Sequence, residues 1–138
     1  SHDNRDDYTL CNTSILEYSD RFQNLNEICM NNDEVDKYLE SFQKKFDIKT
    51  LTIYTLHYTP PLEKIYKIEN KYKIDNLCIQ GPSFIIYKLM ILRRFECKKV
   101  ELIWFKYNGE KVDNGLNEEE KEFVLLYEQR YNLKIKFV

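Results

Sequence analysis

Glycine, proline and histidine are scarce in this sequence of 138 residues, which contains three glycines, three prolines, two histidines and no alanine. Phosphate-binding loops are rich in glycine, because glycine lets the backbone approach a phosphate closely. The isolated Gly81, Gly109 and Gly115 form no such loop, and the sequence contains no H-x-E motif. Without a complete catalytic set of residues, we expect neither catalysis nor a cofactor.

Short-range metal and disulfide patterns are also missing. The four cysteines, Cys11, Cys29, Cys78 and Cys97, lie far apart and form no C-x-x-C pair. Structural zinc needs ligands in short pairs, so we expect no metal site. The sequence has no secretory segment and no apolar run of the roughly 18–20 residues needed to span a bilayer. We therefore expect reduced cysteines in a soluble nuclear or cytoplasmic protein without membrane contacts.

Charges of the two signs are nearly balanced, since 21 Lys or Arg and 23 Asp or Glu give a net charge of −2. Affinity for nucleic acid depends on neutralising phosphates, so we do not expect direct nucleic-acid binding. Aromatic residues are abundant, with eleven tyrosines, eight phenylalanines and one tryptophan. A tyrosine-rich surface favours protein contacts, and half-buried packing against the core is the alternative interpretation.

A helix is predicted over residues 32–48, after a segment at 1–31 that holds neither a helical nor a strand period for long. Asn32 or Asp33 can cap this helix by accepting backbone N–H bonds. Apolar side chains then recur at helical intervals at Val35, Tyr38, Leu39, Phe42 and Phe46. Such a stripe predicts a helix that packs against an apolar surface.

Two strands are predicted after this helix and form the first hairpin of our interpretation. Residues 49–58 alternate between two faces, and Pro60-Pro61 ends the strand because proline has no backbone donor. Residues 62–74 then alternate apolar and lysine-rich positions. One face of this hairpin is therefore expected to meet water.

Gly81-Pro82 is typical of a helix start, because proline is favoured at the first helical position. The apolar side chains expected on the inner face of this helix, over residues 81–95, are Ile85, Ile86, Leu89, Met90, Leu92 and Phe95. The cations Lys88, Arg93 and Arg94 are expected to face water. A buried strand over 83–92 is the alternative, since periodicity alone does not separate the two.

The C-terminal part predicts a hairpin, a helix and a last strand. The apolar strand 100–105 is followed by Asn-Gly at 108–109, a pair typical of type I′ hairpin turns. Asn117 and Glu120 have the spacing of a capping box at the start of a helix, which Asn132 ends. A half-buried final strand follows, in which Leu133, Ile135 and Phe137 alternate with Lys134 and Lys136.

With these elements in this order, residues 49–138 resemble a ubiquitin-like domain, most closely the ring-finger-associated kind at the C-terminal end of Polycomb group RING-finger proteins. The similarity rests on Lys71-Tyr72-Lys73, the helix 84–95, the strand 100–104, the turn 107–112 and the strand 133–137. The resemblance implies an α+β fold of the β-grasp type, in which a mixed sheet packs on one main helix. The helix at 32–48 is additional, and the ubiquitin-like domain of tubulin-folding cofactors is the alternative family.

The resemblance implies a non-catalytic scaffold that binds partner proteins in a chromatin-associated, Polycomb-like complex. An unpaired edge strand offers backbone groups that a partner strand can complete, and flanking aromatic residues supply anchors. The residues expected to make this contact are Tyr54, Tyr58, Tyr66, Tyr72 and Trp104. For each of them, packing in or near the core is the alternative.

A metal-dependent nuclease is the competing interpretation. A carboxylate followed two residues later by lysine can hold a divalent metal and orient a water molecule. This spacing occurs at 69–71 and 96–98, with Asp47 or Asp75 as a further ligand. Because 32% of the residues are charged, such triplets arise readily by chance, and we favour the binding module.

Overall fold

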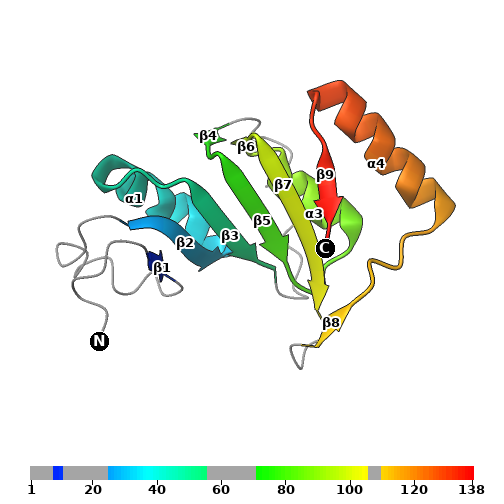
Figure 1. The fold of residues 1–138 in the computed structure, drawn as a ribbon, viewed down its shortest axis with the longest axis horizontal. Helices are drawn as coiled ribbons and strands as arrows, with labels where there is room; N and C mark the ends of the chain where they lie inside the picture. Colours follow the sequence, from blue (N-terminus) through cyan, green and yellow to red (C-terminus); the bar gives the residue numbers. More distant parts are fainter. Residues whose placement is uncertain (1–7, 11–24, 56–70, 106–109) are drawn as a thin grey trace.

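A sheet of seven strands lies at the centre of the computed structural model, which describes residues 8–10, 25–55, 71–105 and 110–138. The strands are β1 (Tyr8–Leu10), β2 (Leu25–Asn31), β3 (Thr50–Tyr54), β5 (Asn76–Gln80), β7 (Lys99–Phe105), β8 (Lys111–Val112) and β9 (Ile135–Phe137). They follow the order β1-β2-β3-β5-β7, and both β8 and β9 pair with β7 (Figure 1). Every pairing is parallel except that of β8, which is antiparallel to the end of β7.

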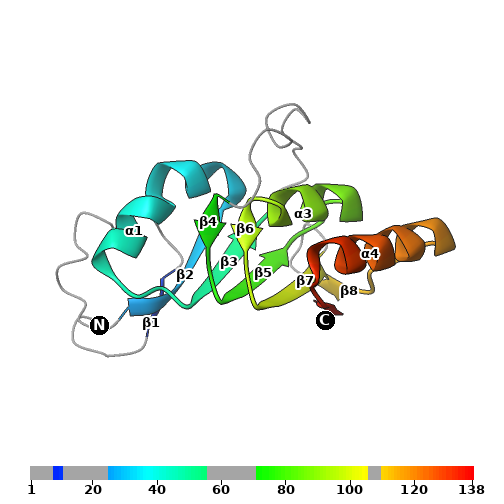
Figure 2. The same cartoon turned by 90° about the horizontal axis from the view of Figure 1, so that it is seen from above.

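Helices return the chain from the end of one parallel strand to the start of the next. Between β2 and β3 lie η2 (Asn32–Glu34), η3 (Val35–Leu39) and α1 (Glu40–Lys45), between β5 and β7 lies α3 (Ile85–Leu92), and before β9 lies α4 (Glu118–Tyr131). The helices α1, α3 and α4 all lie on one side of the sheet (Figure 2). Two short strands, β4 (Tyr72–Lys73) just before β5 and β6 (Phe95–Glu96) just before β7, pair in parallel with each other and form a separate two-stranded sheet.

The strands repeat at regular intervals along the chain. Ile28, Leu51, Leu77 and Val100 are cross-strand neighbours spaced 23 to 26 residues apart. A second row, two residues further along each strand, consists of Met30, Ile53, Ile79 and Leu102. Both rows are buried in one core with apolar side chains of the helices. Such strand–helix units, each packed on its neighbours, make a short solenoid.

The predicted N-terminal helix is confirmed, with a boundary that differs slightly. Helical structure covers residues 32–45, and Val35, Leu39 and Phe42 are fully buried. The capping residue is Asn31, whose backbone N–H donates to Glu34 Oε1 at 3.0 Å, in place of Asn32 or Asp33. The apolar stripe predicted from the sequence therefore packs on the sheet.

The predicted C-terminal elements are also confirmed. Asn117 Oδ1 accepts a hydrogen bond from Glu120 N at 2.8 Å, and Glu120 Oε1 accepts one from Asn117 N at 3.1 Å. The helix ends at Asn132, which adopts a left-handed conformation with φ of 50°. The hairpin is present as the antiparallel β7–β8 pair, while its expected turn at 108–109 lies outside the described residues. The expected last strand is present as β9, which lies beside β7.

The predicted first hairpin is wrong in the described residues. β3 pairs in parallel with β2 and β5, and Tyr72–Lys73 pairs in parallel with Phe95–Glu96. Most of the expected second strand falls in 56–70, outside the described part of the chain. Alternation predicts that a segment is a strand but does not identify its partner. The chain is α+β with a mixed sheet, as expected, and the ubiquitin-like β-grasp arrangement is not confirmed.

The helix predicted at 81–95 is confirmed, but its start and its outer face are not. It begins at Ile85, and its N-cap Phe84 is extended. Gly81 lies outside the helix, with a φ of 137°, and a Cβ there would be 2.0 Å from O of Thr55, the residue after β3. Ile86 is 47% exposed, whereas Lys88 and Arg94 are buried. Both cations find oxygen partners inside the fold. Arg94 Nη1 donates to Asn32 Oδ1 at 3.1 Å and Nη2 to Asp36 Oδ1 at 2.5 Å.

Candidate interaction surface

The face of the sheet opposite the helices, which we call the open face, carries three cross-strand rows of side chains. Successive side chains of a strand point to opposite faces, so the residues that alternate with the two buried rows point away from the helices. The rows are Glu27, Thr50, Asn76 and Lys99; then Cys29, Thr52, Cys78, Glu101 and Lys136; then Asn31, Tyr54, Gln80 and Ile103. The repeat of the fold thus brings residues that are distant in sequence onto one surface.

The centre of the open face, on β3 and β5, has no charged side chain. We call it the uncharged strip, and it consists of Thr50, Thr52, Tyr54, Asn76, Cys78 and Gln80. Asn76 Nδ2 donates to Thr50 Oγ1 at 3.3 Å, and Gln80 Nε2 donates to Cys78 Sγ at 3.4 Å. Tyr54 is 37% exposed and the other five are partly buried by their neighbours. The strip therefore offers hydroxyl, amide and aromatic groups to a ligand.

Charged side chains lie on either side of the uncharged strip. On the C-terminal side, Lys99, Glu101 and Lys136 belong to β7 and β9, and Lys136 Nζ is 3.9 Å from Glu101 Oε1. On the N-terminal side, Glu27 belongs to β2. A surface with an uncharged, tyrosine-containing centre and a charged periphery has the composition of a protein interface.

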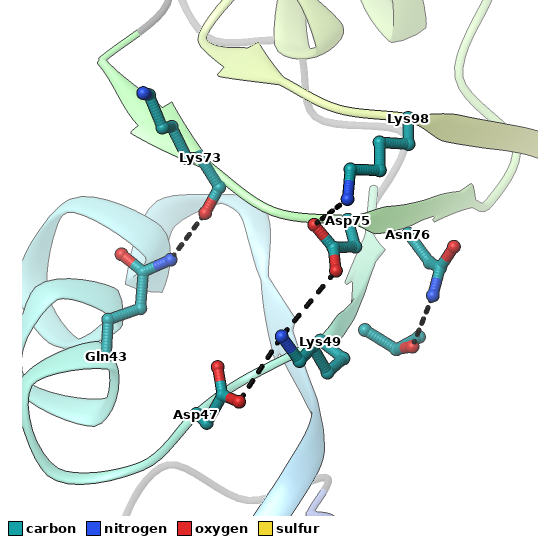
Figure 3. A network of polar contacts seen from close by, with 8 residues as sticks. Gln43, Asp47, Lys49, Lys73, Asp75, Asn76 and Lys98 are labelled. Carbon is teal, nitrogen blue, oxygen red and sulfur yellow. Dashed lines mark hydrogen bonds and ion pairs between the residues drawn. The ribbon is translucent and has the colours of Figure 1, made fainter.

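A network of ion pairs lies where β3, β5 and β7 begin (Figure 3). Lys49 Nζ is 3.3 Å from Asp47 Oδ2 and 3.8 Å from Asp75 Oδ2, and Lys98 Nζ is 3.6 Å from Asp75 Oδ1. The hydrogen bond and the charge of Asp47 raise the pKa of Lys49. Asp75 O also accepts hydrogen bonds from the backbone of Lys98 and Lys99. These exposed pairs are weak, and they link the residues that precede β3, β5 and β7.

This network does not assemble the metal site that the nuclease interpretation requires. Glu96 Oε2 lies 3.5 Å from Lys73 Nζ, while the carboxylate of Asp75 faces Lys49 and Lys98. Within the described ranges, no group of three or more His, Cys, Asp or Glu is placed to hold a metal ion. Residues 69–70 of the other triplet lie outside those ranges.

The described cysteines are free thiols, as expected, and two of them have raised pKa values. Burial, with a smaller contribution from the charge of Glu101, raises the pKa of Cys78. Burial and the charge of Glu96 raise the pKa of Cys97 to about 11. Nucleophilic cysteines require the opposite shift. Cys29 is buried, and Cys11 lies outside the described residues.

Lys88 is a titratable group whose pKa is strongly shifted by burial. Its side chain is fully buried, and Nζ donates to Gly81 O at 2.8 Å, Ser83 O at 2.7 Å and Ser83 Oγ at 2.9 Å. Burial lowers its pKa to about 7. A lysine nucleophile must reach its substrate, whereas this amine is enclosed by the loop that it holds. Its position therefore indicates a structural role.

Of the five expected aromatic contact residues, three lie in the described part of the chain, and these three do not share one surface. Tyr54 lies on the open face. Tyr72 is 5% exposed and donates its hydroxyl to Asp36 Oδ1 at 2.8 Å, and Trp104 is 7% exposed with its ring 4.4 Å from Lys88 Nζ. Tyr72 and Trp104 are therefore packed in the core, which was the alternative interpretation for each of them. Tyr58 and Tyr66 lie outside the described residues.

Apart from Tyr54, the residues of the uncharged strip were not among those expected from the sequence, because small polar side chains carry no catalytic or aromatic signal. A repeated spacing of apolar residues in the sequence indicates where the strip lies. Ile48, Leu51 and Ile53 have the same spacing as Ile74, Leu77 and Ile79, and as Cys97, Val100 and Leu102. The residues between the last two members of each set are Thr52, Cys78 and Glu101, all in one row of the open face.

Comparisons with known proteins do not identify a family. No family model matches this chain, and neither do any of the curated proteins or solved structures compared with it. Among the helices of the described residues, none is long and apolar enough to cross a membrane. Any assignment of function must therefore come from the surfaces that this fold assembles.

Proposed function

We propose that this chain is a non-catalytic protein-interaction module that binds a segment of a partner protein across its open face. The observation that carries the proposal is the uncharged strip. Six side chains from two strands are all uncharged, although 32% of the residues of the chain are charged. Interfaces are depleted in charge at their centre and enriched in tyrosine, which matches the strip and Tyr54.

The solenoid arrangement supports the same function. The I-x-x-L-x-I spacing at Ile48, Leu51 and Ile53 recurs at Ile74, Leu77 and Ile79. It resembles the L-x-x-L-x-L core of leucine-rich repeats, which have a period of about 20–29 residues. Solenoids of stacked repeats commonly use an extended surface to bind proteins.

The chemistry of the strip favours an extended, largely uncharged peptide segment as the occupant. Hydroxyl and amide groups of Thr50, Thr52, Asn76 and Gln80 can pair with the backbone groups of such a segment, and Tyr54 offers an aromatic anchor. A charged segment would lose hydration over a surface that supplies no opposite charge. The charged residues at the periphery would set orientation and association rate.

This proposal does not depend on the ubiquitin-like resemblance. That resemblance implied a scaffold in a Polycomb-like or tubulin-related complex, and it relied on a first hairpin that the described sheet lacks. We propose the interaction function on the open face alone. The partner, and a nuclear or cytoplasmic setting, would follow from identifying the bound segment.

Selection of a phage-displayed library of random dodecapeptides against the chain tests the proposal. We expect binders whose affinity falls at least tenfold, or about 1.4 kcal/mol, in Thr52→Lys, because this change places a cation in the uncharged strip. Tyr54→Ala should weaken the same binders by about 2 kcal/mol, the typical loss at an aromatic anchor. Isothermal titration calorimetry gives both values.

Ser41→Lys is the matched control, since it adds the same cation at an exposed position on α1. It should leave the affinity unchanged within twofold, and all three variants should keep the melting temperature of the original chain. Binders that tolerate both Thr52→Lys and Tyr54→Ala would exclude the open face as the site. A failure to select any binder would count against the interaction function itself.

A further inference from the structure

A groove between α3 and α4, on the side of the molecule opposite the open face, is lined mainly by apolar side chains. Ile86, Leu89 and Met90 line it from α3, and Phe123, Leu126 and Tyr127 line it from α4. Its volume is about 380 Å³. Because Tyr127 donates its hydroxyl to Leu89 O at 3.4 Å, the two helices are in contact at the floor of the groove.

The walls of this groove expose an unusual amount of apolar surface. Ile86 is 47% exposed, Phe123 49% and Leu126 58%. Apolar side chains that cluster around a groove mark interaction sites more often than single exposed ones do. Along α4, only Val124 and Tyr127 are buried by this chain itself. The helix thus presents a second apolar stripe that its own fold does not cover.

Charges are distributed unequally along the groove. The helices α3 and α4 each return the chain to the start of a parallel strand, so they run in the same direction, and their C-terminal ends lie together. Arg93 and Arg130 line the groove at that end. The first turn of α4, at the other end, carries Glu118, Glu119 and Glu120. The groove is therefore apolar in the middle, basic at one end and acidic beyond the other.

We infer that this groove binds one amphipathic helix of a partner protein, with acidic residues at the end that lies next to Arg93 and Arg130. Such a helix inserts apolar side chains at positions i, i+3, i+4 and i+7, which span about 10 Å. The eight residues of α3 rise about 12 Å, so the floor of the groove has the matching length. Acidic groups at one end of the helix complement the two arginines.

A library of displayed amphipathic helices tests this inference directly. One face carries leucine at i, i+3, i+4 and i+7, and the flanking positions are randomised among Glu, Lys and Gln. We expect the selected helices to concentrate Glu at one end. Selection against Arg130→Glu should instead enrich Lys at that end. Equal use of Glu and Lys in both selections, or no enrichment at all, would overturn the inference.

Two neighbouring leucines of α4 provide a matched pair of variants. Leu126 lines the groove and is 58% exposed, while Leu125 is 57% exposed and does not line it. Leu126→Glu should reduce the affinity of the selected helices at least tenfold, and Leu125→Glu less than twofold. Equal losses in the two variants would place the contact elsewhere. Circular dichroism should give the same melting temperature for both, since each side chain is already exposed.

Two further measurements distinguish a partner helix in this groove from binding at the open face and from self-association. Thr52→Lys, on the open face, should leave the binding of the selected helices unchanged, so this inference and the proposed function can fail independently. Sedimentation of the original chain checks self-association. A dimer that Leu126→Glu dissociates would assign the groove to a second copy of the chain and overturn the inference of a partner helix.

Discussion

Lys88 shows how a single residue can connect three parts of the fold. Its Nζ binds three oxygens of the loop formed by Gly81 and Ser83, and it lies 4.4 Å from the centre of the Trp104 ring. Ser83 Oγ is in turn 2.7 Å from Thr55 Oγ1. The end of β3, the turn before α3 and the end of β7 are thereby joined through one amine.

The buried amine predicts a pH-dependent stability. Burial lowers the pKa of Lys88 from 10.5 to about 7, so above pH 7 the folded chain holds a neutral amine while the unfolded chain remains protonated. The unfolded state then binds more protons, and the free energy of unfolding rises with pH. Relative to Lys88→Met, the original chain should gain about 1 kcal/mol between pH 7 and pH 8. Urea unfolding at the two pH values measures the difference.

The comparison with Lys88→Met removes the contributions of other groups, such as Cys97, whose pKa is raised to about 11. The three oxygen acceptors and the Trp104 ring favour the charged amine, in opposition to burial. A stability difference that is constant between pH 7 and pH 8 would mean that these contacts dominate and that Lys88 stays protonated in the folded state.

Among the strands that the structure describes, β7 pairs with the largest number of others. It pairs with β5 along one edge and with β9 and β8 along the other, and its Leu102 side chain is fully buried. Val100, Leu102 and Trp104 point toward the helices, whereas Glu101 and Ile103 lie on the open face. A strand in this position should contribute strongly to stability through its inner side chains.

Leu102→Ala is expected to lower the free energy of unfolding by about 2 to 5 kcal/mol, because it leaves a cavity where both neighbouring strands are fixed. The adjacent Ile103→Ala is the control, since Ile103 lies on the open face and is only partly buried. It should cost less than half as much. A loss below about 1 kcal/mol for Leu102→Ala would show that β7 is peripheral to the core.

At the scale of the whole molecule, stability should vary along the stack of strands. Solenoid units are stabilised mainly by their neighbours. Among the described strands, β2, β3, β5 and β7 pair on both edges, whereas β1 pairs only with β2 and β9 only with β7. The two ends of the stack are therefore expected to open more readily than its centre.

Native-state hydrogen exchange measures this gradient. Amides of β5 should exchange only through global unfolding, and those of β9 through a local opening with a lower free energy. The physical reason is that opening β9 exposes one interface, while opening β5 exposes two. Amides of β9 that exchange as slowly as those of β5 would show that the sheet unfolds as one cooperative unit.

Much of the fold was predictable where it depends on contacts close in sequence. The capping box of Asn117 and Glu120, the left-handed Asn132 and the apolar stripe of Val35, Leu39 and Phe42 each involve residues a few positions apart. The partner of β3 was not predictable in this way. Alternation in residues 49–58 is equally compatible with an antiparallel hairpin and with the parallel pairing observed, because both bury the same face.

The sequence by itself determined the presence of the helices, the capping box and left-handed end of α4 and the β7–β8 hairpin, since helical and strand periods and local hydrogen bonds depend only on near neighbours. Only the tertiary structure decided that the strands stack in parallel, that Lys88 and Tyr72 are buried, and that Tyr54 shares a surface with Gln80. The physical reason is that these outcomes depend on which distant segments meet. Burial of an amine is tolerable only where the folded chain supplies its oxygens.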